Sequence, residues 1–195
     1  MPITATTNRQ KYIFQMRFYL NLIAFQIGWF ACVFGAAHSI PVLGPMVVLV
    51  VIALHLFLSK RPYRELSLIG IAGLIGLSWD SFLVITGLVA YPSGMIIDSL
   101  APYWIIAMWM LFATTLNVCL RWLRKKYLLS LVLGAFLGPL TYYSGAKIGG
   151  ISLLNQMDSL ISIGLGWAVI LPLLSELSRR LDGSGIPEGF NHLNV

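Results

Sequence analysis

The chain has 195 residues, of which 58% are hydrophobic and only 10% are charged. Soluble domains carry about 25% charged residues, so this composition excludes an ordinary soluble protein and indicates a protein of the lipid bilayer. The formal net charge of +6 would suit nucleic-acid binding, but the basic residues flank apolar runs instead of forming one patch, which excludes a nucleic-acid partner.

The first 17 residues form a polar and basic leader, residues 1–17. Two interpretations of this leader remain open: a short amphipathic helix on the cytoplasmic leaflet, or a frayed segment that only sets the orientation of the chain. The apolar run that follows is longer than the roughly 7–15 residues of a signal-peptide core, so we expect an uncleaved helix.

Six apolar runs each approach the length of about 20 residues that a helix needs to cross a hydrocarbon core. They are residues 18–37, 41–58, 66–89, 102–123, 127–146 and 159–177. The loops between them are short, so consecutive helices should be neighbours in space. The sequence therefore predicts an all-α integral membrane protein with a six-transmembrane-helix bundle in residues 18–177. Residues 178–195, rich in glycine and polar residues, are predicted to form a flexible tail.

Basic residues are distributed unequally between alternate loops. Twelve lie in the leader, in the second and fourth loops, and after the sixth run, whereas the other three loops contain only Lys147. The twelve are Arg9, Lys11, Arg17, Lys60, Arg61, Arg64, Arg121, Arg124, Lys125, Lys126, Arg179 and Arg180. Because cytoplasmic loops carry the excess of Lys and Arg, both termini are predicted to be cytoplasmic, with the basic residues near anionic membrane lipids.

Small residues recur along the runs at helical spacing. Gly28 lies in the first run, Gly73 in the third, and Gly134 with Gly138 forms a GxxxG pattern in the fifth. Small residues let helix backbones approach closely in lipid, so these four are predicted to mark helix contacts. Such contacts would form within one bundle, with a second copy of the chain, or with another membrane protein.

No metal or cofactor is predicted. The two cysteines lie in different runs, and no Cys/His spacing typical of a metal site is present. His55 is expected to lie by itself near one membrane surface.

The most informative single residue is Asp80, deep within the third run in the stretch GLSWDSFLVITGLV. A carboxylate at the bilayer centre costs about 2.5–3.5 kcal/mol on insertion scales, so Asp80 should face the bundle interior or a cavity. A rise of about 1.5 Å per residue places Trp109, Tyr142 and Tyr143 at nearly the same depth, with Lys147 about one and a half turns beyond. Together with Trp79, these residues form the candidate ligand-binding site.

Three interpretations of Asp80 remain open. It is a packing residue held by tyrosine and tryptophan donors, a protonatable or head-group-binding group in a transport or lipid-handling cavity, or a catalytic acid or base. The sequence contains no HExxH, serine elbow or phosphate loop, which argues against an enzyme.

The blocks WDSFLVITGLVAYP, APYWIIAMWMLFATTLN, RWLRKK and GAFLGPLTYYSGAKIGG resemble a family of small bacterial inner-membrane proteins that is defined only as a domain of unknown function. The resemblance extends from the first run into the sixth. The positions that carry it are Trp79, Asp80, Pro102, Trp104, Trp109, Thr114, Thr115, Gly138, Pro139, Tyr142, Tyr143, Gly145 and Lys147. It implies a bacterial inner-membrane location. Members are often encoded near genes for fatty-acid modification, so it also implies lipid-related work.

The leading hypothesis is therefore binding or translocation of a lipid or small amphipathic molecule within the bundle. The alternative is an accessory protein that binds a partner membrane enzyme through its small-residue helix faces. A membrane-embedded enzyme is the third.

Overall fold

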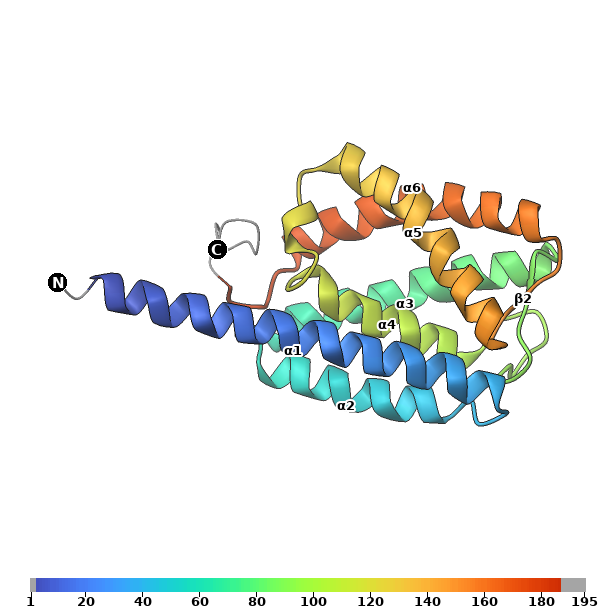
Figure 1. The fold of residues 1–195 in the computed structure, drawn as a ribbon, viewed down its shortest axis with the longest axis horizontal. Helices are drawn as coiled ribbons and strands as arrows, with labels where there is room; N and C mark the ends of the chain where they lie inside the picture. The colour runs from blue at the N-terminus through green and yellow to red at the C-terminus, as the bar shows by residue number, and fades with distance from the viewer. Residues whose placement is uncertain (1–2, 187–195) are drawn as a thin grey trace.

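The computed structural model describes residues 3–186, with side chains from Tyr12 onward, and this part of the chain contains six α-helices (Figure 1). They are α1 (Ile3–Ala37), α2 (Leu43–Phe57), α3 (Pro62–Ile85), α4 (Tyr103–Leu116), α5 (Tyr127–Ile148) and α6 (Gln156–Arg180). Short elements lie between them: β1 (Val89–Ala90), the 3₁₀ turn η1 (Arg121–Leu123) and β2 (Ser152–Leu153). The predicted all-helical class is confirmed.

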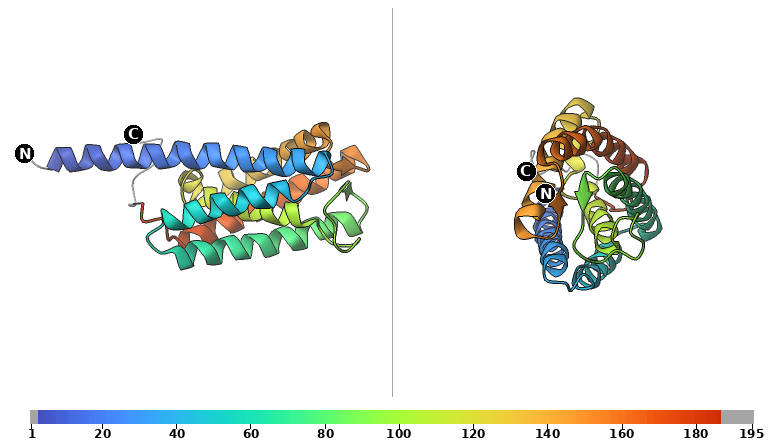
Figure 2. Two further views of the ribbon diagram at one scale, coloured as in Figure 1. Left: turned by 90° about the horizontal axis from the view of Figure 1, so that it is seen from below. Right: turned by 90° about the vertical axis from the view of Figure 1, so that its right-hand side faces the viewer.

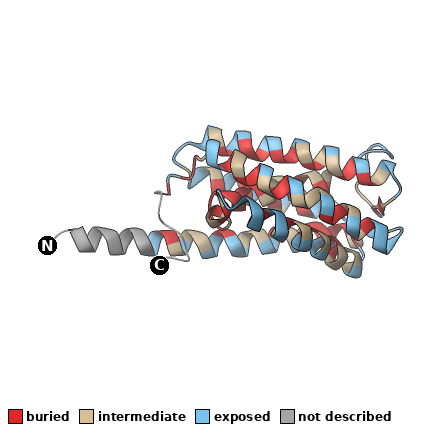
Figure 3. Ribbon diagram, turned by 90° about the horizontal axis from the view of Figure 1, so that it is seen from above, coloured by how far each residue is buried: buried red, intermediate tan, exposed pale blue. Residues whose placement is uncertain are grey.

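Four of these helices, α1, α3, α5 and α6, are long and apolar enough to cross a membrane. Helices α2 and α4 are apolar but shorter, with 15 and 14 residues. Exposed positions recur along the helices (Figure 3), and many of them are large hydrophobic residues. Soluble monomers rarely expose contiguous apolar surface on this scale, so the helices suggest a membrane protein.

The helices alternate in direction, so the loops gather at two ends of the bundle (Figures 1 and 2). The α2–α3 and α4–α5 loops lie at the same end as the start of α1 and the end of α6. We call this the basic end, because its loops carry Lys60, Arg61, Arg124, Lys125 and Lys126. The α1–α2, α3–α4 and α5–α6 loops form the opposite end.

At the opposite end, two loops are joined by a short β-ladder. Strands β1 and β2 pair antiparallel, with Val89 opposite Leu153 and Ala90 opposite Ser152. The Ser159 hydroxyl donates a hydrogen bond to the nearby Leu88 carbonyl at 2.6 Å. These bonds satisfy loop backbone groups and tie the α3–α4 loop to the α5–α6 loop.

Close packing between helices depends on glycine. Helix α5 packs on α6, α3 packs on α4, and α1 packs on α2 and α4. Each of the four glycines singled out in the sequence lies against another helix of the same chain. The contacts are Gly28 with Leu111, Gly73 with Met110, and both Gly134 and Gly138 with Trp167.

Several helix boundaries differ from those expected, most of all at the leader and in the fourth helix. The leader is not separate: α1 is one helix from Ile3 to Ala37, about 52 Å long at the α-helical rise, and it projects beyond the bundle at the basic end (Figure 2). The fourth helix, expected over 102–123, ends at Leu116, about two turns early, and a turn with η1 follows it. There the side-chain amide of Asn117 bonds to Glu65 and Arg124.

The prediction of a flexible tail from residue 178 onward is wrong for the first part of that segment. Helix α6 continues to Arg180, and Ser184 and Ile186 are buried against the bundle. Side chains of α3 and of the α4–α5 loop bind the polar groups of this segment. Local composition gives no sign of these long-range contacts. The remainder of the predicted tail, residues 187–195, lies outside the described residues.

A glycine pair tests the helix contacts. A Cβ at Gly134 would lie 2.2 Å from the Trp167 carbonyl oxygen, whereas a Cβ at Gly70 would meet nothing within 4 Å. We expect Gly134→Ala to lower the free energy of unfolding by about 1–3 kcal/mol through overpacking. Gly70→Ala should be neutral or stabilising by up to about 1 kcal/mol. Denaturant unfolding in detergent measures both; equal effects would contradict the packing described.

Candidate functional site

Asp80 lies at the junction of three helices and a loop, and its side chain is completely buried. One carboxylate oxygen accepts hydrogen bonds from the hydroxyls of Tyr91, at 2.5 Å, and Tyr142, at 2.7 Å. The other oxygen accepts the indole N–H of Trp109 at 2.6 Å. Hydrogen bonds to an ionised acceptor are among the strongest in proteins, so Asp80 holds α3, α4, α5 and the segment after β1 in register.

Counting the helical rise from the sequence identified the helices that meet at Asp80, but not every residue predicted to contact it does so. Trp109 and Tyr142 contact Asp80, whereas the side chains of Tyr143 and Lys147 form a separate pair, with the ammonium 5.1 Å from the ring centroid. Adjacent residues on a helix point in directions about 100° apart, so Tyr142 and Tyr143 cannot face the same group. The prediction that Tyr143 and Lys147 join the Asp80 layer is therefore wrong.

Tyr91 is the donor that the sequence did not indicate. It lies just after β1, outside every apolar run. The α3–α4 loop folds back into the bundle and brings this tyrosine to Asp80. A count of helical rise applies only to residues on helices, so it gave no signal for Tyr91.

Trp79, the neighbour of Asp80, has a packing role. Its ring occupies the space beside Gly166 of α6, where a Cβ would lie 2.2 Å from it, and its centroid is 5.6 Å from that of Phe82. The Trp79 indole N–H is buried and makes no hydrogen bond within the described part of the chain. Trp79 therefore joins α3 to α6 and does not contribute to the Asp80 cluster.

A cleft of about 420 Å³ lies next to the Asp80 cluster, between α1, α4, α5 and α6. Its wall is mainly aromatic and aliphatic, and includes Phe25, Trp29, Trp109, Phe112, Tyr142 and Trp167. The rings of Trp109 and Trp167 stack, with centroids 4.6 Å apart. The Trp167 indole N–H is buried near the Tyr142 hydroxyl, without the geometry of a hydrogen bond.

Asp80 acts on this cleft indirectly. Its carboxylate is not part of the cleft wall, but Trp109 and Tyr142 are, and both donate to it from behind. The three groups bonded to Asp80 are two tyrosine hydroxyls and an indole, with no histidine, lysine or second carboxylate among them. The arrangement fixes the position of two wall residues and keeps the Asp80 carboxylate outside the cleft.

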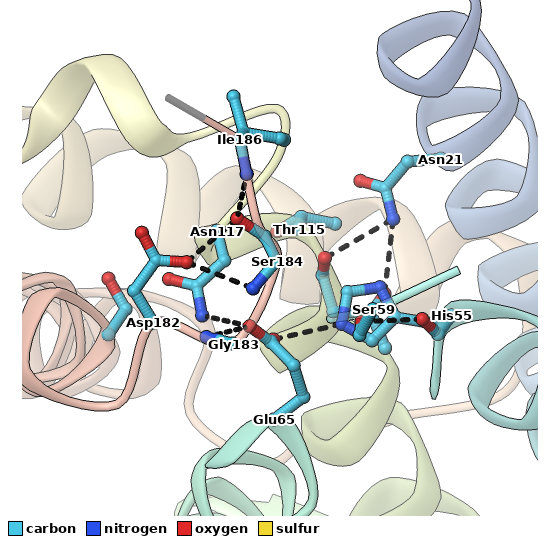
Figure 4. Close-up of polar contacts among 12 residues, drawn as sticks. Asn21, His55, Ser59, Glu65, Thr115, Asn117, Asp182, Gly183, Ser184 and Ile186 are labelled. Carbon is cyan, nitrogen blue, oxygen red and sulfur yellow. Dashed lines mark hydrogen bonds and ion pairs between the residues drawn. The ribbon is translucent and has the colours of Figure 1, made fainter. Parts of the chain in front are cut away.

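A second buried carboxylate, Glu65, lies at the basic end (Figure 4). Its Oε2 lies 2.9 Å from Nε2 of His55, and its Oε1 accepts hydrogen bonds from the Asn117 amide at 2.8 Å and the Gly183 backbone N–H at 2.7 Å. The expectation that His55 stands alone is wrong. Sequence analysis missed this cluster because Glu65 lies at the edge of an apolar run, where a charged residue is ordinary.

The α4–α5 loop holds the segment after α6 through a neighbouring ion-pair network. Arg121 and Arg124 contact the Asp182 carboxylate at 2.7 and 2.9 Å, and Arg17 of α1 donates to the Ser184 carbonyl. Burial opposes ionisation of Asp182, but the Ser184 hydrogen bonds and the two arginines outweigh it and lower the carboxyl pKa. A lowered folded-state pKa means that this stabilisation is present at neutral pH and is lost on acidification below the usual aspartate range.

Two adjacent tyrosines provide a matched test of the Asp80 cluster. Tyr142→Phe removes one donor from a buried carboxylate, so we expect the free energy of unfolding to fall by about 1–3 kcal/mol. Tyr143→Phe keeps the ring that Lys147 faces and should change the free energy of unfolding by less than about 0.5 kcal/mol. Denaturant unfolding followed by fluorescence distinguishes them. If Tyr142→Phe left the free energy of unfolding unchanged, the hydrogen bond from Tyr142 to Asp80 would not contribute to stability.

The Glu65 cluster predicts a local effect on the segment after α6. In Glu65→Gln the acceptor of the Gly183 N–H loses its charge and one oxygen, so amide hydrogen exchange over residues 181–186 should accelerate. Glu176→Gln is the control, because Glu176 pairs with Arg179 and Arg180 on the helix surface and does not touch the segment. Unchanged exchange in Glu65→Gln would show that other contacts hold the segment by themselves.

Comparison with known proteins gives a family but no activity. A search of curated proteins found no match, and a search of solved structures likewise found none. The family model described as "Protein of unknown function (DUF2878)" matches residues 18–173, which include all of α2–α5, the Asp80 cluster and Glu65. The chain belongs to this family of proteins of unknown function, DUF2878.

Proposed function

We propose that the protein binds a lipid or another small amphipathic molecule in the cleft between α1, α4, α5 and α6. The observation that carries this proposal is the cleft itself. Its volume of about 420 Å³ falls within the range of about 300–1,000 Å³ typical of small-molecule sites. Its apolar and aromatic wall, with a few hydroxyl and indole groups, matches the chemistry of an acyl chain rather than that of a polar metabolite.

The helix arrangement supports entry from the side. Helix α1 packs on α2 and α4, and α5 packs on α6, so α1 and α5 make few direct contacts with each other. Leu22 on α1 and Leu137 on α5 line the cleft, yet they are 41% and 50% exposed. A cleft whose wall reaches the outer surface between two helices is open to the hydrocarbon region, from which a lipid-like molecule can enter.

We further propose a topology in which all six helices span the inner membrane of a bacterium and the basic end faces the cytoplasm. The excess of Lys and Arg in the loops at that end supports this orientation. In this orientation the cleft lies within the bilayer. Asp80 is then a positioning residue that fixes two wall residues, Trp109 and Tyr142, from outside the cleft.

The alternative of an accessory protein that docks through small-residue faces has less support. Its argument in the sequence was the set of glycines at helical spacing, and those glycines contact helices of the same chain. The third possibility, catalysis by Asp80, lacks a histidine, a lysine or a second carboxylate among the groups bonded to the carboxylate.

Two leucines on α5 allow a matched test. Leu137 lines the cleft, whereas Leu140, 58% exposed on the same helix, does not. Leu137→Trp adds volume within the cleft, so we expect a molecule that co-purifies with the wild type to be lost. Leu140→Trp adds the same side chain outside the cleft, so this variant should retain the bound molecule. Native mass spectrometry of protein extracted in mild detergent measures the retained mass, and lipid analysis identifies it.

Either of two results would contradict the proposal. The wild type and both variants could carry the same bulk lipid in the same amount, or Leu140→Trp could lose the bound molecule as completely as Leu137→Trp. Thermal unfolding of both variants shows that any loss does not come from misfolding.

A further inference from the structure

The cleft is elongated along the helices. Four cleft residues of α1, Leu22, Phe25, Trp29 and Val33, cover 11 helical steps from the first to the last, or about 16 Å at the α-helical rise. A hydrocarbon chain can therefore lie along the cleft, parallel to α1.

The two ends of the cleft differ in charge. At the basic end the wall includes Trp122, and the ammonium of Lys126 lies 5.3 Å from the centroid of its ring. Lys125, the preceding residue, is exposed in the same loop. At the opposite end the wall is formed by apolar side chains such as Val33 and Ile151.

The lysines at the basic end differ from the arginines beside them. Arg121 and Arg124 are held by Asp182, so their charge is already compensated within the fold. Within residues 12–186 neither Lys125 nor Lys126 forms an ion pair, and both are exposed in the loop that follows Trp122. A lysine beside an aromatic ring at the edge of an apolar cleft is suited to bind the anionic head of a molecule whose chain enters the cleft.

We propose that the ligand is an amphiphile with a hydrocarbon chain and an anionic headgroup, a carboxylate or a phosphate. Its hydrocarbon chain lies along the cleft, and its headgroup lies beside Lys126 and Trp122 at the basic end. This inference rests on the proposed function and adds the class and orientation of the ligand. It assigns to Lys126 a binding role that Lys147 lacks, since Lys147 lies over Tyr143, and neither of these residues lines the cleft.

The tryptophans provide a contact readout, because four of the six in the chain line the cleft. Bromine quenches tryptophan fluorescence on contact, so a brominated chain in the cleft reports its own binding. The full chain in phosphatidylcholine nanodiscs is titrated at pH 8 with 9,10-dibromostearate, with the corresponding dibrominated alcohol, and with a phosphatidylcholine carrying two dibrominated chains.

We expect the carboxylate to give half-maximal quenching at a mole fraction about 5-fold lower than the alcohol does, as one lysine near the surface contributes about 1 kcal/mol. Lys126→Gln should raise the midpoint for the carboxylate by about 5-fold and leave that for the alcohol unchanged. Lys147→Gln is the matched control, a lysine over an aromatic ring away from the cleft, and should change neither midpoint. The dibrominated phosphatidylcholine has a zwitterionic headgroup, so Lys126→Gln should leave its midpoint unchanged.

The possible failures are separable. Equal midpoints for carboxylate and alcohol, or no effect of Lys126→Gln, would overturn the anionic headgroup and leave binding in the cleft intact. If Lys147→Gln raised the carboxylate midpoint as much as Lys126→Gln does, the effect would be one of general surface charge. That result would overturn the role of Lys126. A rise in the phosphatidylcholine midpoint in Lys126→Gln as large as that for the carboxylate would overturn the preference for an anionic headgroup. No saturable quenching by any probe would overturn the proposed function together with this inference.

Discussion

The structure depends on the requirement that a carboxylate buried among apolar helices must have donors on both oxygens. Asp80 and Glu65 are both fully buried, and each is satisfied only because segments far apart in the chain converge on it. Leaving such a group without a partner is more costly than the net gain of an ordinary hydrogen bond. Each carboxylate therefore fixes the relative positions of several helices, one in the body of the bundle and one at the basic end.

The cleft lies beside the Asp80 cluster, between α1 and the helices α4, α5 and α6. Helices α3 and α4 are joined through Asp80, and α5 is joined to both through Tyr142 and to α6 through glycine contacts with Trp167. Helix α1 belongs to the other side of the bundle, with α2 and α4. The cleft thus has two rigid walls that meet at α4, which favours a binding site whose shape exists before the ligand arrives.

Much of the fold was predictable from the sequence, because helix length and apolar character are local properties. The six helices, their approximate ranges and the clustering of basic loops at one end all follow from runs of residues near one another in the chain. The site was predictable only in part. Helical rise gave the correct depth for Asp80, Trp109 and Tyr142, but depth does not specify direction around a helix. Tyr143 shares the depth but points elsewhere, and Lys147, about one and a half turns beyond, lies over the Tyr143 ring.

The sequence by itself determined an all-helical protein of apolar composition, with a buried aspartate and one strongly basic end. Only the tertiary structure decided which groups surround that aspartate, that Glu65 is buried, and that residues 182–186 close the basic end. The physical reason is that hydrogen bonds such as Tyr91 to Asp80 and Gly183 to Glu65 join residues from loops and distant segments. Helical periodicity describes neighbours along one helix, whereas these contacts arise when separate helices and loops pack together.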